Sequence, residues 1–380
     1  MRLSPVLQGM GVYPFVRLGE ARAAAEARGV DVIDFGLGEP REETPPFIRR
    51  ALAEAVELEP ISGYPSAAGL PETRAAIAAW TERRFGARLD PDTEVVPTLG
   101  SKELVFGLAQ VVGGPGATVG VPTPGYPVPE RGAAFAGASV APVPLVAELG
   151  WLPDLDALPS GLDLLWLNYP NNPTGARAPL EFLERAQHRA LSDGFVLACD
   201  EAYSELWFEG EPPHSALELA DRRNLLVVNT LSKRSSMPGY RAGFTAGDPE
   251  LIAALKKYRP NAGVTPPAFV QRAAAAAWGD ETHVDEVRDR YRAKRDALLP
   301  ALLELGLEPA GGDASFFLWL RTPIADDEAF ATALLDEHGI IVAPGSYMGG
   351  AGHVRVAVVP TLERCREAAE RLSRSRAGQR

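Results

Sequence analysis

The feature that most constrains the fold of this chain is the alternation of short apolar runs with longer amphipathic segments. Several runs are apolar at consecutive positions, which is typical of strands covered on both faces. The longer segments repeat their apolar residues with helical spacing. This alternation predicts a mainly parallel β-sheet with helices on both sides. The expected strands cover residues 32–35, 94–97, 118–121, 140–144, 164–168, 195–200, 225–230 and 241–246, and the expected helices cover residues 70–85, 102–112, 180–192 and 249–258.

The pattern changes after about residue 265, where a long charged segment with helical spacing begins a second group of elements. A chain of 380 residues is longer than one hydrophobic core usually serves. We therefore expect a large domain over residues 40–275 and a smaller α+β domain made of residues 276–380 and an N-terminal arm, residues 1–39. The elements expected in the second group are a helix at 281–305, a strand at 316–320, a helix at 327–337, a strand at 354–358 and a final helix.

Charge and composition exclude several classes of protein. The formal net charge is −12, from 38 basic and 50 acidic residues, which argues against binding to nucleic acid or to anionic membranes. No apolar run reaches eighteen residues, so no membrane span is expected. The first five residues lack the apolar core of a signal peptide, and Cys199 and Cys365 are too few for a disulfide framework, so we expect a cytoplasmic protein. The five histidines are scattered without ligand spacing, and no metal site is expected.

Polar residues follow several of the expected strands. Asp200 ends one apolar run, Asn172 follows another, and Gly100-Ser101-Lys102 stands between a strand and a helix. In an open parallel sheet, ligands bind beyond the carboxyl ends of the strands. These positions therefore predict one cleft that contains a carboxylate, an amide and a helix N-terminus.

Lys233 adds an amine to this cleft. It ends the apolar run that begins at Leu225, whereas Lys256, Lys257 and Lys294 lie in charged stretches with helical spacing. A lysine that loses its charge on desolvation becomes a nucleophile suited to Schiff-base chemistry. The position of Lys233 therefore favours a covalent role.

Taken one at a time, these signals allow structural interpretations as well. Gly100-Ser101 is a common helix cap, and it is also a possible phosphate site. Asp200 would pair with an arginine or a helix N-terminus in a structural role, or with a protonated ring nitrogen in a functional one. Asn171-Asn172-Pro173-Thr174-Gly175 is a good turn by propensity alone. Arg355 would be either an exposed residue of an alternating strand or a residue that binds a carboxylate with two hydrogen bonds.

The order of the motifs along the chain is more specific than any one of them. It resembles the fold-type I aminotransferases, which use pyridoxal 5′-phosphate, over essentially the whole chain. The resemblance implies a three-layer αβα large domain with a mainly parallel seven-stranded sheet, a smaller α+β domain and a homodimer. The motifs are Tyr64…Gly69, Gly100-Ser101-Lys102, Pro124-Gly125-Tyr126-Pro127, Asn172-Pro173-Thr174-Gly175, Asp200-x-x-Tyr203, Thr230-x-x-Lys233, Arg241 and Arg355.

The resemblance also implies a role for each matching residue. Lys233 would hold the cofactor as a Schiff base and then shuttle a proton, Asp200 would keep the pyridine nitrogen protonated, and Tyr203 with Asn172 would hydrogen-bond the ring oxygen. Tyr126 would stack on the ring, Arg355 would bind the substrate α-carboxylate and Gly38 would leave it room. Tyr64 would reach the phosphate in the neighbouring subunit. The remaining phosphate-binding set would be Gly100, Ser101, Lys102, Thr230, Ser232 and Arg241.

Among these enzymes the chain is most similar to the N-succinyl-LL-diaminopimelate aminotransferases of lysine biosynthesis. Tyr13-Pro14-Phe15, Lys233-Arg234-Ser235 and the segment 277–284 carry this similarity, although Ser315 and Phe317 replace the family's frequent Gly and Tyr. The implied reaction moves an amino group between glutamate or 2-oxoglutarate and a dicarboxylic partner, whose distal acid group needs a cation. Arg234 and Arg17 are the candidates for that cation.

Other reactions use the same catalytic residues. The chain also fits an aspartate, alanine or aromatic and kynurenine-type aminotransferase, or a β-lyase that acts on cysteine conjugates with the same cofactor. A sensor domain of a transcription regulator is disfavoured, because the chain has no room for a DNA-binding domain and its charge is strongly negative.

Overall fold

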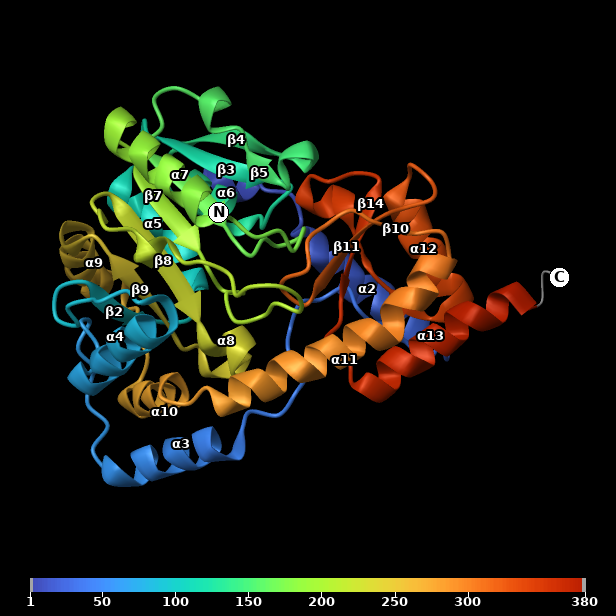
Figure 1. Ribbon diagram of the computed structural model, residues 1–380, viewed down its shortest axis with the longest axis horizontal. Coiled ribbons are helices and arrows are strands. Elements are labelled where there is room, and N and C mark those ends of the chain that lie inside the picture. Colours follow the sequence, from blue (N-terminus) through green and yellow to red (C-terminus); the bar gives the residue numbers. More distant parts are fainter. Residues whose placement is uncertain (1–2, 378–380) are drawn as a thin grey trace.

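A computed structural model describes residues 3–377 of the chain (Figure 1). Within these residues the largest sheet has eight strands in the order β2-β9-β8-β7-β6-β3-β4-β5. Seven of them have four or more residues, and the two-residue strand β5 extends one edge. The strands are β2 (Val95–Thr98), β3 (Thr118–Thr123), β4 (Ser139–Val146), β5 (Leu152–Pro153), β6 (Leu164–Asn168), β7 (Val196–Asp200), β8 (Leu225–Thr230) and β9 (Gly243–Gly247).

The sheet is mainly parallel, as the alternation of apolar runs predicted. Strands β8, β7, β6, β3 and β4 run parallel to their neighbours in this series, and β9 runs antiparallel to both β2 and β8. The register pairs Asn168 of β6 with Asp200 of β7, so the carboxyl ends of these two strands lie side by side. This edge of the sheet is where the sequence placed the cleft.

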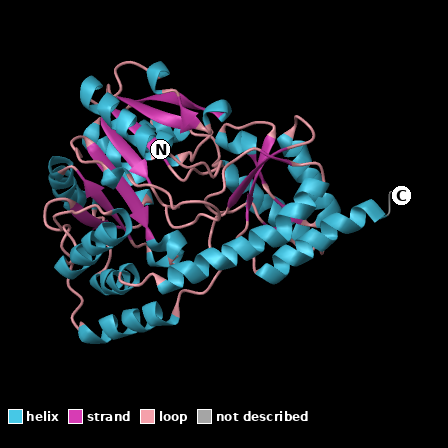
Figure 2. Ribbon diagram, viewed as in Figure 1, coloured by secondary structure: helices cyan, strands magenta, loops and turns pink. Residues whose placement is uncertain are grey.

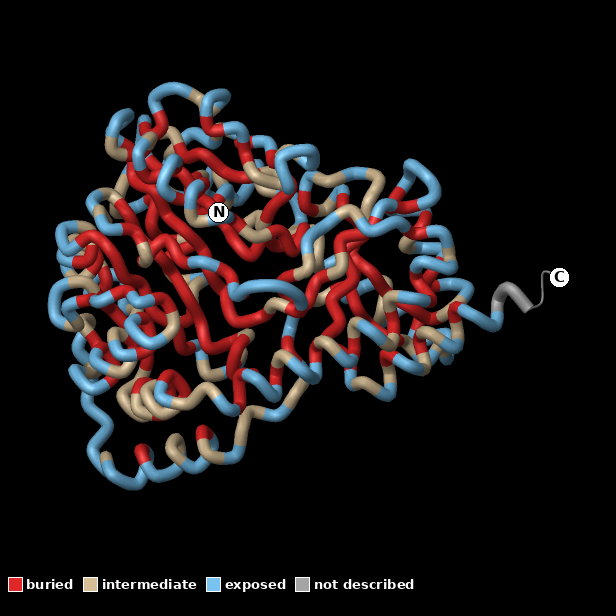
Figure 3. The backbone as a smooth tube through the Cα atoms, in the orientation of Figure 1, coloured by how far each residue is buried: buried red, intermediate tan, exposed pale blue. Residues whose placement is uncertain are grey.

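Helices cover both faces of the sheet and make three layers (Figure 2). One hydrophobic cluster joins α4, α7 and α10 to alternate strand residues such as Leu165 and Leu197, and a second joins α5, α6 and α9 to the intervening residues, such as Trp166 and Ala198. Both faces are therefore buried (Figure 3), which explains the uninterrupted apolar runs. The helices are α3 (Pro46–Leu58), α4 (Pro71–Phe85), α5 (Lys102–Val112), α6 (Val128–Ala136), α7 (Leu180–Asp193), α9 (Pro249–Ala262) and α10 (Ala268–Trp278).

A second, four-stranded sheet follows in the C-terminal part of the chain, in the order β10-β11-β14-β13 with antiparallel pairing. The long helix α11 (Thr282–Glu304) leads from the large sheet to this unit and packs against α13 (Figure 1). The other elements here are α12 (Asp327–His338), α13 (Leu362–Ala377), β10 (Glu308–Pro309), β11 (Phe317–Arg321), β12 (Ile340–Ile341), β13 (Ala343–Pro344) and β14 (His353–Ala357).

The N-terminal segment joins the C-terminal unit. It contains α1 (Pro5–Gly9), α2 (Pro14–Ala27) and β1 (Ile33–Asp34), and β1 pairs in parallel with β12. The domain boundaries at residues 39/40 and 275/276 stay a prediction. No helix among residues 3–377 is long and apolar enough to cross a membrane.

Candidate active site

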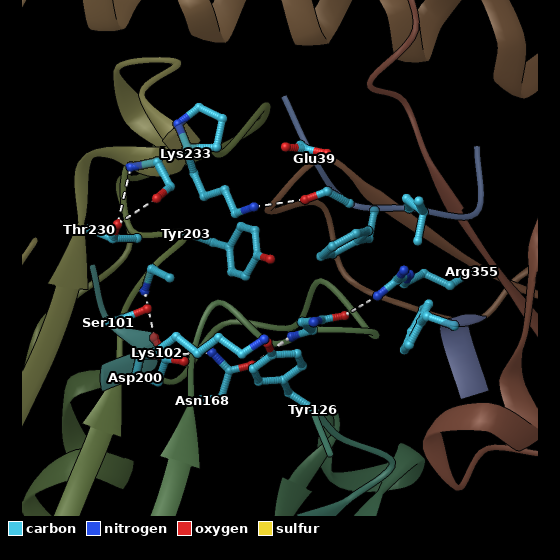
Figure 4. Close-up of a pocket in the computed structure, with 18 of the residues that line it drawn as sticks. Glu39, Ser101, Lys102, Tyr126, Asn168, Asp200, Tyr203, Thr230, Lys233 and Arg355 are labelled. Carbon is cyan, nitrogen blue, oxygen red and sulfur yellow. Dashed lines mark hydrogen bonds between the residues drawn. The ribbon is translucent and has the colours of Figure 1, made fainter. Parts of the chain in front are cut away.

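One cavity of about 390 Å³ lies at the carboxyl ends of β6, β7 and β8 (Figure 4). Residues from both sheets and from the N-terminal segment line it. The cavity brings together twelve of the residues that the sequence singled out: Gly38, Ser101, Lys102, Tyr126, Asn172, Asp200, Tyr203, Thr230, Ser232, Lys233, Arg241 and Arg355.

Lys233 extends into this cavity from α8 (Leu231–Arg234), the single helical turn that follows β8 (Figure 4). Its Nζ donates a 2.7 Å hydrogen bond to the carbonyl oxygen of Gly38. Burial lowers the pKa of the amine from 10.5 to about 8, and the nearby Arg355 guanidinium acts in the same direction. A substantial fraction of the amine is therefore neutral, and nucleophilic, near physiological pH.

The lowered pKa of Lys233 should be visible in its reactivity. In ligand-free protein, reductive methylation of Lys233 with formaldehyde should reach half its maximal rate near pH 8, because the protonated amine that predominates below this pH does not attack an aldehyde. Peptide mass spectrometry of samples labelled between pH 6 and pH 11 measures this rate. The exposed Lys257 provides the comparison. A midpoint for Lys233 near its ordinary value of 10.5 would show that the amine is fully solvated.

Asp200 supplies the carboxylate of the cavity. Its side chain is buried and accepts a 3.1 Å hydrogen bond from the backbone N–H of Ala202. Burial raises the pKa of this carboxyl to about 6, and the charge of Lys233 partly opposes the shift. A buried carboxylate at this position will favour a cationic partner.

Hydroxyls and cations gather at one end of the cavity. Ser101 and Lys102 stand at the start of α5, and the Thr230 and Ser232 hydroxyls lie 2.8 Å apart. Burial and the neighbouring Arg241 both lower the pKa of Lys102. Two cations beside several hydroxyls form a donor set suited to a phosphate dianion.

A guanidinium occupies another part of the cavity. Arg355 on β14 is buried, and it donates to the Asn172 side chain at 2.9 Å and to the carbonyl oxygen of Gly36 at 2.7 Å. Its guanidinium carbon lies 4.4 Å from the centre of the Phe317 ring and 4.9 Å from the centre of the Phe15 ring. Burial lowers its pKa to about 10. Its buried Nε has no hydrogen-bond partner among residues 3–377, and a guanidinium that lines the cavity with a donor unused is suited to a carboxylate.

Glycines make room at two places around the cavity. A Cβ atom on Gly38 would lie 2.7 Å from the Phe317 ring, so only glycine fits beside this aromatic residue. Gly100 does not line the cavity. It has a φ of 70°, and a Cβ atom there would lie 2.8 Å from an Arg241 nitrogen, so its contribution is to let Arg241 pack closely.

Two predicted substrate-binding arginines do not reach the cavity. Arg234 points away from the cavity, where its buried guanidinium donates to Glu281 at 3.0 Å and lies beside the Trp80 and Trp278 rings. Arg17 is exposed on α2, with its guanidinium carbon 5.9 Å from the Tyr347 ring centre. We therefore withdraw Arg234 as the distal cation, because its buried guanidinium already forms an ion pair with Glu281 outside the cavity.

Ser315 and Tyr64 also lie outside the cavity. Ser315 is buried with a φ of 64°, in the left-handed region that favours glycine, which gives a physical reason for the family's frequent glycine at this position. Its hydroxyl accepts a 3.1 Å hydrogen bond from the N–H of Phe317. Tyr64 is fully exposed.

Several lining residues were not assigned to the site from the sequence. Tyr13 and Phe15 reach it from the N-terminal segment, and Glu39 lies beside Gly38. Asn168 at the end of β6 links the strand ends: it donates to the Asp200 carbonyl oxygen at 2.8 Å and accepts from the N–H of Asn172 at 2.8 Å. Its place at the end of a strand was the signal that could have identified it.

Comparison with known proteins gives consistent matches. The family described as "Aminotransferase class I and II" matches residues 30–372. The LL-diaminopimelate aminotransferase of Desulforudis audaxviator is 38% identical over 375 residues, which are 96% of both chains, and that of Aquifex aeolicus is 38% identical over 369 residues, 95% of both chains.

Solved structures give the same result at the level of the fold. An aminotransferase from Neisseria meningitidis has a TM-score of 0.90 and 34% identity over 98% of this chain and 100% of its own. An aspartate aminotransferase from Thermus thermophilus with maleate has a TM-score of 0.90 and 32% identity over the same shares.

Proposed function

Because this chain belongs to the class I and II aminotransferases, which depend on pyridoxal 5′-phosphate, we propose that it moves an amino group between LL-diaminopimelate and 2-oxoglutarate. The observation that supports this most is that the Lys233 amine, the Asp200 carboxylate and the Arg355 guanidinium line one cavity. Transamination needs a nucleophilic amine, a group that stabilises a cationic ring nitrogen, and a binding site for the α-carboxylate of the substrate.

The residues present fit pyridoxal 5′-phosphate by their chemistry. Ser101, Lys102, Thr230, Ser232 and Arg241 would hold its phosphate. Tyr126 would stack on the ring, and Tyr203 with Asn172 would hydrogen-bond the ring oxygen. When bound, the cofactor accepts the electron pair released at the Cα of the amino acid.

Three residues of the chain would carry the chemistry. The buried Asp200 would hold a proton on the pyridine nitrogen, because a carboxylate in an apolar site is stabilised by a positive partner. Arg355 would orient the amino acid through its α-carboxylate. The neutral amine of Lys233 would then remove the proton from the Cα, which a pKa of about 8 permits.

The choice of substrate rests on the relatives and on Glu39. The two relatives described above are named for LL-diaminopimelate, and not for the N-succinyl derivative predicted from the sequence. Glu39 is exposed and lines the cavity beside Gly38. A carboxylate there would attract the free distal ammonium of LL-diaminopimelate, whereas the N-succinyl derivative carries an amide and an added carboxylate at that end.

The same proposal includes a homodimer. The chain exposes apolar side chains at the end of α3 and just after it, namely Val56, Leu58, Ile61 and Tyr64. A run of exposed apolar residues of this kind marks an interaction surface. Contact with a second copy here would cover these residues and would place Tyr64 where it can reach the phosphate site of the neighbouring subunit.

Half-reactions distinguish the possible substrates. The holoenzyme is mixed with one amino acid at a time, and the loss of the absorbance of the lysine-bound cofactor is followed. We expect LL-diaminopimelate to react at least ~10-fold faster than its N-succinyl derivative, because only the free form has an ammonium group to pair with Glu39. Faster reaction with aspartate, alanine, kynurenine or an aromatic amino acid would contradict the proposed substrate.

A Glu39→Gln variant tests the reason for this preference. It removes the charge and keeps the shape, so the preference for LL-diaminopimelate should shrink. Glutamate has no distal ammonium, so its half-reaction should keep its rate or become faster. A preference that is unchanged in Glu39→Gln would show that other residues select the substrate.

A further inference from the structure

A polar network with a buried centre and two partly exposed carboxylates lies behind the helix that carries Lys233. We call it the α8–α11 network and define it as Arg234, Ser235, Asp280, Glu281 and His283. Ser235 Oγ lies 2.8 Å from His283 Nε2, and His283 Nδ1 lies 2.6 Å from an oxygen of Asp280. Arg234 and Ser235 are fully buried, as is nearly all of His283.

The aspartate, histidine and serine stand in the order of a nucleophilic triad. Ser235 is nevertheless completely buried and does not line the cavity, so no substrate can reach its hydroxyl. The network therefore does not serve hydrolysis. Its contact with the end of the helix that carries Lys233 indicates a structural role for that helix.

Helix α8 depends on outside contacts for its orientation. It has only four residues, and one turn of helix is held by few hydrogen bonds of its own. At its start, the N–H of Leu231 donates to the carbonyl oxygen of Ala242 at 3.0 Å, and the Thr230 hydroxyl accepts from the N–H of Ser232 at 3.1 Å. At its end, the α8–α11 network provides the anchors.

The anchors at the end of α8 are strong ones. The Arg234 guanidinium donates to the Ala277 carbonyl oxygen at 3.1 Å and to the Glu281 carboxylate at 3.0 Å. Its carbon lies 4.8 Å from the centre of the Trp278 ring and 5.2 Å from that of Trp80. A charge-assisted contact whose guanidinium is buried fixes the helix end more firmly than an ion pair between two exposed side chains does.

The His283 ring links the end of α8 to the start of α11 through two hydrogen bonds. Asp280 also accepts a 3.0 Å hydrogen bond from the backbone N–H of His283, which holds the acid at the start of α11. With Nδ1 donating to this carboxylate, Nε2 of a neutral imidazole is an acceptor for the Ser235 hydroxyl. Burial lowers the pKa of His283, which favours that neutral form.

Helix α11 connects this network to the other end of the active site. The Tyr291 ring on α11 lies 5.1 Å from Phe316, and Phe316 lies 4.8 Å from Phe317, whose ring contacts Arg355. The same helix thus contacts the helix of the amine at its first turn and the arginine's aromatic support further along.

We propose that Ser235 and His283 are positioning residues for Lys233, which hold α8 so that the amine can transfer the proton at the substrate Cα. This inference rests on the role of Lys233 in the proposed function, but not on which amino acid is the substrate. Loss of the Ser235–His283 hydrogen bond will leave Arg355 in place, because Asn172 and the carbonyl oxygen of Gly36 hold its guanidinium from outside α8. It should therefore slow proton transfer without weakening the binding of the amino acid.

Ser235→Ala tests the proposal, with Ser236→Ala as the matched control. The Ser236 hydroxyl is also buried, but it has no hydrogen-bond partner among residues 3–377, and its removal deletes the same atom one position along the chain. In holoenzyme with the fastest amino donor, Ser235→Ala should lower the half-reaction rate constant about 10-fold, with little change in the concentration for half-saturation. The primary isotope effect with Cα-deuterated donor should rise.

Two further results decide the proposal. His283→Gln should reproduce the slower rate and the larger isotope effect, and the double variant Ser235→Ala/His283→Gln should be no slower than either single variant, because both remove one interaction. Ser235→Ala and His283→Gln with the same rate and isotope effect as Ser236→Ala would overturn the proposal. So would a defect limited to thermal stability or cofactor content. A failure of LL-diaminopimelate as the substrate would leave these comparisons intact.

Discussion

Lys233→Ala is expected to lower the turnover number by ~10³-fold or more while the protein stays folded, because it removes both the covalent attachment and the proton-transfer group. The side chain donates one hydrogen bond, to the Gly38 carbonyl oxygen, and the backbone of α8 is anchored by other residues. Circular dichroism and size-exclusion chromatography check the fold. Steady-state turnover with the best donor and acceptor pair gives the activity.

Lys257→Ala is the matched control for this variant, since it deletes the same side chain at an exposed position away from the cavity. A small amine such as methylamine should restore part of the lost rate in Lys233→Ala, because it can enter the space that the side chain leaves and act as the base. Turnover within a few-fold of wild type in Lys233→Ala would remove this residue from the mechanism.

Asp200→Asn should have the second largest effect, a loss of ~10²–10⁴-fold in turnover, because the amide cannot stabilise a positive charge on the pyridine nitrogen. Asparagine has nearly the same shape, and its side-chain oxygen can still accept from the N–H of Ala202. The expected loss of activity is therefore caused by the missing charge and not by a change in packing. It is measured as the rate of the half-reaction with saturating amino acid.

The same variant should be more stable than wild type when both lack the cofactor. The pKa of Asp200 is raised from 3.8 to about 6 in the folded chain, so the unfolded chain loses its proton first and the free energy of unfolding falls as the pH rises from about 4 to 6. Above pH 6 the cost in the wild type is at most about 3 kcal/mol. Urea unfolding at pH 4 should give the two proteins similar free energies of unfolding. At pH 8 the free energy of unfolding of Asp200→Asn should be the larger one.

Glu201→Gln is the control for Asp200→Asn. Glu201 is the next residue and is also buried, with a pKa raised to about 8 by burial, but it accepts from the N–H of Ala216 and does not line the cavity. Its amide variant should gain stability at high pH and keep its activity. Equal activity losses in the two variants would mean that Asp200 acts through packing.

Much of the site could be predicted because strand ends are local features of a sequence. Asp200, Asn172 and Lys233 each follow an apolar run, and the parallel order of β6, β7 and β8 brings those ends to one edge. The contributions of Glu39 and Tyr13 were missed. The resemblance brought Gly38 of the N-terminal segment to the site, but no local pattern indicates which other side chains of this segment reach the cavity. The helices α1, α2, α3, α6, α8 and α10 were also not expected.

Arg234 shows the limit of sequence reasoning most clearly. Its place beside Lys233 suggested a substrate contact, but adjacent residues of a helix point in different directions. The structure puts the Lys233 side chain in the cavity and the Arg234 side chain beside Trp80 and Trp278.

The sequence by itself determined the αβα layers, the edge of the sheet that holds the site and most of the polar residues there, because periodicity and strand ends depend on neighbours along the chain. Only the tertiary structure decided which side chains share the cavity with Lys233. Asn172 and Arg355 are hydrogen-bonded although 183 positions separate them, and the direction of each side chain is set by the packing of elements distant in sequence.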